Sequence, residues 1–206
     1  MLELVMVIVV MGILAAVAIP RMERDLRQEA GDNILAAIRY TQHLALMDDK
    51  TNPEDPKWQM TLWQIRFSHY TKDGRVRWYY EIASNKDHGA NLDQSEAAMD
   101  PSNGKFFFNR APHDEVGSQD SESIFIGRKY GIDDIRFKGG CSGAQHIAFD
   151  HLGRTYTGIF SANNDFSKVM VNNCRIVFGF EGEETPLIIT VARETGFAQI
   201  VDQNGS

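Results

Sequence analysis

The chain opens with an unbroken apolar run at residues 4–19, LVMVIVVMGILAAVAI, which contains no polar side chain. A helix of this length extends about 24 Å, slightly less than the ~30 Å hydrocarbon core of a bilayer. The helical pattern continues beyond the run, and this continuation makes up the difference. Residues 1–20 are therefore predicted to form a hydrophobic transmembrane and assembly helix.

Residues 21–49 continue the helix with a different pattern. Apolar positions recur at helical spacing from Met22 to Ala45, and charged residues fill the opposite face. The pattern ends at Met47, before a loop that contains Pro53 and Pro56. We expect an amphipathic continuation whose apolar face lies on a sheet.

The remaining residues, 50–206, are predicted to form one β-rich globular domain with an antiparallel sheet. Alternating apolar positions at 58–67 and 76–82 flank a hairpin signal, Lys72-Asp73-Gly74. Further strand patterns occur at 123–126, 132–137, 145–149, 154–158, 174–180, 187–192 and 197–201. The polar stretch at 84–120 is interpreted as a variable loop region. The predicted fold class is α+β, with a long N-terminal helix packed on the sheet.

Glu3 is the anomaly of the apolar segment, because a carboxylate carried into lipid costs about 2.5–3.5 kcal/mol. It either lies at headgroup level or pairs with a neighbouring subunit. A cleaved signal peptide is disfavoured, since no Lys or Arg precedes the run and no small-residue cleavage site follows it.

The segment MLELVMVIVVMGILAAVAIP at 1–20 resembles the N-terminal helix of type IV pilins and type II secretion pseudopilins. Glu3 matches the helix glutamate of that family, Gly12 begins its GILAA segment, and Pro20 matches its helix-kinking proline. The leader peptide and the first two mature residues of the family are missing before Met1. We attribute this difference to a start placed too late or to a fragment.

The resemblance implies the type IV pilin fold, and it gives Glu3, Gly12 and Pro20 roles in contacts between subunits. It implies a single-pass bacterial inner-membrane protein with a periplasmic domain, or a filament after assembly. The implied partners are other pilin or pseudopilin subunits, the inner membrane, the assembly platform with its ATPase, and prepilin peptidase. It also places the domain where disulfides form, so we expect Cys141 to pair with Cys174 rather than to leave two free thiols.

The second half looks like the GspH/FimT family of minor pilins and pseudopilins. The matching segments are YGIDDIRF at 130–137, IAFDHLGRTYTG at 147–158 and the closing PLIITVARETGFAQI. The expected function is that of a minor pilin or pseudopilin that initiates or caps a type IV pilus or a type II secretion pseudopilus. The alternatives are a major filament subunit and a DNA-binding minor pilin for DNA uptake.

Composition and motifs point away from catalysis. The net charge of −7 argues against a general nucleic-acid binder, so nucleic acid is not an expected partner. His146 and His151 flank one strand at an odd spacing that places them on opposite faces, which disfavours a shared metal. No Ser or Cys lies in a nucleophile motif. We expect no enzyme activity, no catalytic residues, no metal and no cofactor.

Overall fold

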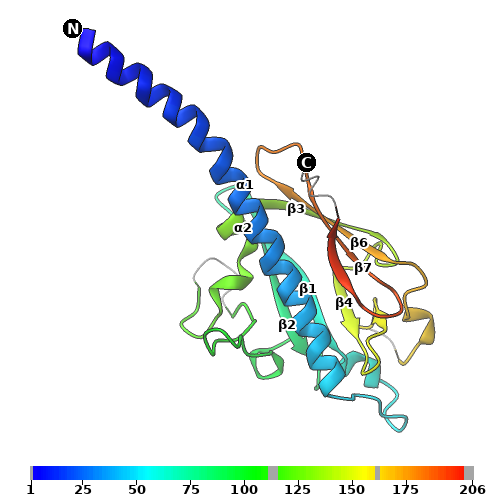
Figure 1. The fold of residues 1–206 in the computed structure, drawn as a ribbon. Helices are drawn as coiled ribbons and strands as arrows, with labels where there is room; N and C mark the ends of the chain where they lie inside the picture. Colours follow the sequence, from blue (N-terminus) through cyan, green and yellow to red (C-terminus); the bar gives the residue numbers. More distant parts are fainter. Residues whose placement is uncertain (1, 111–115, 161–162, 202–206) are drawn as a thin grey trace.

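The computed structural model describes residues 2–110, 116–160 and 163–201, and within the first helix it describes the side chains of 5–12 and of 26 onward. Helix α1 (Leu2–Met47) extends away from a strand-rich body at its N-terminal end and lies against that body at its C-terminal end (Figure 1). The described strands are β1 (Trp63–Lys72), β2 (Arg75–Ser84), β3 (Ile132–Gly139), β4 (His146–Phe149), β5 (Thr155–Tyr156), β6 (Cys174–Phe180), β7 (Leu187–Val191) and β8 (Ala198–Val201). The short helices are α2 (Ile126–Tyr130), η1 (Trp58–Thr61), η2 (Gln94–Glu96), η3 (Glu122–Ile124) and η4 (Phe166–Lys168).

The strands form two four-stranded antiparallel sheets, in the orders β2-β1-β4-β5 and β3-β6-β7-β8. The long β1/β2 hairpin turns at Asp73 and Gly74, which both have positive φ, as a type I′ turn requires. The sheets and the C-terminal half of α1 enclose one core. The buried apolar helix residues are Ala30, Ile34, Ala37, Ile38 and Ala45, which share one face of the helix.

The predicted fold class is wrong in two respects. The β-rich part contains two antiparallel sheets instead of one, because β3 pairs with β6 rather than joining β1 and β2. In addition, nowhere in the described chain is there a helix both long enough and apolar enough to cross a membrane. The predicted transmembrane first half at residues 1–20 and the inner-membrane localisation are therefore incorrect. The physical reason is that the helix continues past the apolar run through charged residues, Arg21, Glu23 and Arg24, so the continuation adds helix length but no apolar length. The apolar part stays near ~24 Å, short of a ~30 Å hydrocarbon core.

The polar stretch at 84–120 is also more ordered than predicted. Ala83 forms a bridge with Ala97, and Phe106 forms bridges with Met99 and with Asp120. Phe107 is buried and its ring contacts those of Tyr40 and Tyr80. The described part of this stretch therefore pairs with the β2 edge of the first sheet and contributes Phe107 to the core.

Candidate functional site

The first described turns of α1 expose an apolar surface. Large side chains from Val5 to Met11 are each 51–68% exposed. Consecutive residues cover every direction around a helix, so this segment is apolar on all sides. Gly12 follows, and no described atom outside its own helix lies within 4 Å of where its Cβ would be. A contiguous exposed apolar surface of this kind is typical of an interaction site, and a glycine beside it permits close approach by another helix.

Glu3 and Pro20, the other predicted assembly residues, belong to the backbone of α1. Their side chains lie outside the described residues. The intersubunit roles of Glu3, Gly12 and Pro20 therefore remain predictions.

The C-terminal half of α1 is fixed to the β-sheets by polar side chains as well as by its buried face. Arg27 donates to the Pro186 carbonyl at 2.8 Å, and Arg39 donates to the Ala198 carbonyl at 3.1 Å. Tyr40 donates to the Met99 carbonyl at 2.9 Å. At the end of the helix, Asp48 accepts a hydrogen bond from Trp63 Nε1 at 2.9 Å. The helix is thus anchored along one half, while its apolar start stands clear of the domain (Figure 1).

A row of ionisable side chains crosses the first sheet on the face opposite the core. In the register of the strands, Arg66 on β1 lies opposite both Glu81 on β2 and His146 on β4. Burial raises the pKa of Glu81 to about 7, against the opposing effect of Arg66. Burial, aided by the Arg66 charge, lowers the pKa of His146 to about 4. Sequence reasoning missed this row, because the alternation of β1 and β2 marks this face as outward and gives no sign of the segments that bury it.

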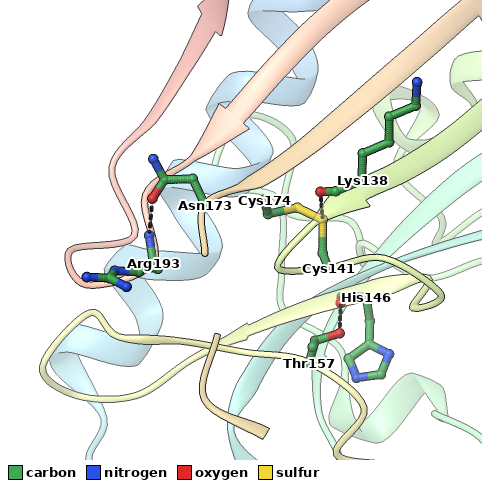
Figure 2. Close-up of a disulfide and its surroundings, with 7 residues drawn as sticks. All are labelled: Lys138, Cys141, His146, Thr157, Asn173, Cys174 and Arg193. Carbon is green, nitrogen blue, oxygen red and sulfur yellow. Dashed lines mark hydrogen bonds between the residues drawn. A yellow bond between two sulfur atoms is a disulfide. The ribbon is translucent and has the colours of Figure 1, made fainter. Parts of the chain in front are cut away.

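The structure joins Cys141 and Cys174 by a disulfide, which is the pairing expected from the sequence (Figure 2). Both residues are fully buried. Two glycines allow the chain segments to approach: a Cβ on Gly140 would lie 2.0 Å from the Asn172 carbonyl oxygen, and Gly139 has positive φ. The disulfide therefore fixes the segment after β3 to the start of β6.

In the described parts of the chain, no group of three or more His, Cys, Asp or Glu side chains is placed so that it could hold a metal ion. His146 and His151 are not brought together: His146 accepts a hydrogen bond from the Ile159 amide at 3.3 Å, whereas His151 lies 2.9 Å from an Asp49 carboxylate oxygen.

Comparison of the chain with family models, with curated proteins and with solved structures finds no match in any of the three.

Proposed function

We propose that this protein is a structural subunit of a pilin-like filament, in the role of a minor pilin or pseudopilin. The observation that carries the proposal is the division of α1 into two parts. Its C-terminal half is buried and hydrogen-bonded against both sheets, whereas residues 5–11 expose apolar side chains on every side of the helix. The exposed part contributes nothing to the described core, so we infer that its apolar side chains contact another molecule.

Packing of this segment against the equivalent helices of other subunits would remove its apolar surface from water, at about 25 cal/mol for each Å² buried. Such head-to-tail contacts between like subunits extend into filaments when they do not close into a ring. In this proposal, Gly12 lets neighbouring helices approach, and Glu3 provides the charged contact between subunits that the family resemblance implies. The partners are other pilin-like subunits and the machinery that assembles them, and the role is not enzymatic.

A single charge in the exposed segment tests the proposal. Ile8→Lys places an ammonium group in the proposed helix contact while leaving the described core untouched, since Ile8 is 62% exposed. We expect at least a tenfold lower amount of the variant in filaments sheared from the source bacterium, measured by quantitative immunoblot against total cell protein.

Met47→Lys is the matched control, because Met47 is an exposed apolar residue of the same helix at its anchored end, with 75% exposure. This control should enter filaments like the wild type, and both variants should have the wild-type melting temperature. Wild-type incorporation of Ile8→Lys would reject the assembly role of the segment.

A further inference from the structure

A cleft of about 590 Å³ opens beside the disulfide, on the outer side of the first sheet. It lies where the chain from Ser142 to His146 meets the segment after β5. Among the residues that line it are Arg66, Ser142, His146, Thr157, Phe160 and Lys168. Its volume is within the range of about 300–1,000 Å³ that is usual for small-ligand sites.

The charge of this cleft is of one sign. Arg66 and Lys168 supply two cationic groups, and none of the described lining residues is acidic. Lys168 interacts electrostatically with Asp165, whose pKa is lowered by hydrogen bonds from Ser167 and, more weakly, by the Lys168 charge. Asp165 does not line the cleft. In a protein with a net charge of −7, a cleft with this lining is a local exception.

Arg66 is held in a defined position. Its guanidinium lies 5.1 Å from the centre of the Phe160 ring, which makes a second, edge-on contact with His146 at 4.9 Å. The backbone of Arg66 is fixed in the middle strand of the sheet, between β2 and β4. Because this contact with the Phe160 ring uses no N–H group, the guanidinium keeps donors for two parallel hydrogen bonds to a carboxylate or phosphate.

His146 also lines the cleft, and its ring is neutral near pH 7 because its pKa is lowered to about 4. Its Nε2 atom accepts from the Ile159 amide at 3.3 Å, so the proton of the neutral ring resides on Nδ1. The Thr157 hydroxyl donates to the His146 carbonyl at 3.4 Å and fixes the neighbouring wall (Figure 2). The opposite wall begins immediately after Cys141, whose disulfide holds it in place. The cleft is therefore formed before any ligand arrives, which reduces the entropy cost of binding.

We propose that this cleft binds a small ligand through an oxyanion, either a carboxylate or a phosphate, with Arg66 as the bidentate partner and Lys168 as the second charge. This inference is independent of the filament role. Isothermal titration of the full chain in a mild non-ionic detergent tests it, with citrate as the carboxylate probe and pyrophosphate as the phosphate probe. Saturable binding that weakens as NaCl rises is expected for at least one probe, and the probe that binds identifies the ligand class.

Three variants connect the binding to these residues. Lys168→Gln should weaken it about tenfold, since a charge-assisted contact is lost. Arg66→Lys keeps the positive charge near Glu81 but removes the bidentate geometry, and it should weaken binding at least as much. Arg175→Gln, an exposed arginine on β6 outside the cleft lining, removes one charge as the control and should bind like the wild type.

Two outcomes would overturn the proposal. One is the absence of saturable binding of both probes at concentrations up to about 10 mM. The other is equal weakening by Arg175→Gln and Lys168→Gln, which would indicate a general charge effect. The melting temperature of each variant, measured in parallel, separates loss of the site from loss of the fold.

Discussion

Glu81 on β2 lies directly across the antiparallel ladder from Arg66 on β1, and both side chains are on the face of the sheet that points away from the core. Glu81 is only 6% exposed, and among the described residues its carboxylate forms no ion pair and accepts one hydrogen bond, from the backbone amide of Asn109 at 3.4 Å. Burial therefore dominates and raises the pKa of Glu81 to about 7, with Arg66 opposing and Asp120 adding to the effect.

The first prediction is that Glu81→Gln stabilises the protein at alkaline pH. Between the ordinary glutamate pKa of about 4.5 and the folded value of about 7, the folded protein holds a proton that the unfolded chain has released. The free energy of unfolding contributed by Glu81 thus falls as pH rises through this window, and the loss is complete above it. With about 1.4 kcal/mol for each pKa unit, the advantage of the variant should reach a few kcal/mol at pH 8.

Urea unfolding of both proteins at pH 4.5, 6 and 8 measures this advantage. Glu122→Gln, which removes the same charge at an exposed site, is the control. An advantage of Glu81→Gln that did not grow between pH 4.5 and 8 would contradict the buried, protonated state of Glu81.

The second prediction is that His146, unlike Glu81, stabilises the protein more as the pH rises. The folded protein excludes a proton that the unfolded chain binds between pH 4 and 6.5, because burial and Arg66 lower the pKa of His146 to about 4. The contribution of His146 to stability is therefore present above pH 6.5 and is lost on acidification through this window. Relative to wild type, His146→Gln should be least stable at pH 7 and should recover by pH 4, in the same urea assay. A difference independent of pH would show that His146 titrates normally.

The pH windows of Glu81 and His146 overlap, and their effects on the free energy of unfolding have opposite signs. In the wild type the two effects therefore partly cancel. No reading of the sequence could have found this, because both residues stand at outward positions of alternating strands. What buries them is the stretch at 84–120 on one side and the cleft walls on the other. The polar composition of the stretch at 84–120 indicated a loop and gave no indication of where the chain would fold back.

The positions of individual helices and strands were predicted better than the way in which the strands pair. The helical spacing after Met22 and the charged, proline-containing segment after Met47 place the end of α1 correctly, and the pattern at 174–180 matches β6. By contrast, the predicted strand at 123–126 is a helical turn that leads into α2, because Ser121 caps it by accepting from the Ser123 amide. The separation into two sheets depends on pairings between distant segments, which single-strand patterns do not encode.

Of the predicted site, the pairing of the two cysteines required only the number of cysteines and the family resemblance. Arg66 and Lys168 could not be identified in advance, since they are 102 positions apart in the numbering and meet only through the folding of the loops around the cleft. Their spatial convergence is a property of the three-dimensional structure.

The third prediction is the loss of stability on removal of the disulfide. Cys141→Ala with Cys174→Ala should lower the free energy of unfolding by about 3–4 kcal/mol in the chain-entropy account, because the bond spans a sequence separation of 33. The melting temperature should fall by several degrees on calorimetry. Reduction of the wild type should give a similar decrease, whereas reduction of the double variant should have no effect. An unchanged melting temperature after complete reduction would show that the β3/β6 ladder alone holds these segments.

The fourth prediction tests the order of the polar stretch at 84–120. Asp100 is buried, and its carboxylate accepts hydrogen bonds from the Ser102 hydroxyl at 2.6 Å, from Ser121 at 2.6 Å and from Ser123 at 3.2 Å. Burial alone would raise its pKa, but these bonds outweigh burial and lower it. The contribution of Asp100 to the free energy of unfolding is therefore fully present above the ordinary aspartate pKa of 3.8. It is lost as the pH falls through the lower pKa of the folded state.

The two oxygens of the Asp100 carboxylate together accept from three hydroxyl groups, and Asp100→Asn replaces one of these oxygens by an amide NH2 group that can only donate. We therefore expect a loss of about 2–4 kcal/mol in the free energy of unfolding at pH 7. Because the carboxylate joins the turn at 100–103 to the segment at 121–123, hydrogen exchange of described amides at 97–107 should accelerate far more than exchange in β6 and β7. Asp87→Asn is the control, since Asp87 is exposed and its carboxylate accepts a local hydrogen bond from the Gly89 amide. If exchange at 97–107 were unchanged in Asp100→Asn, the apolar contacts of Phe107 rather than the carboxylate would be what orders this stretch, and its polar composition would be irrelevant to its packing.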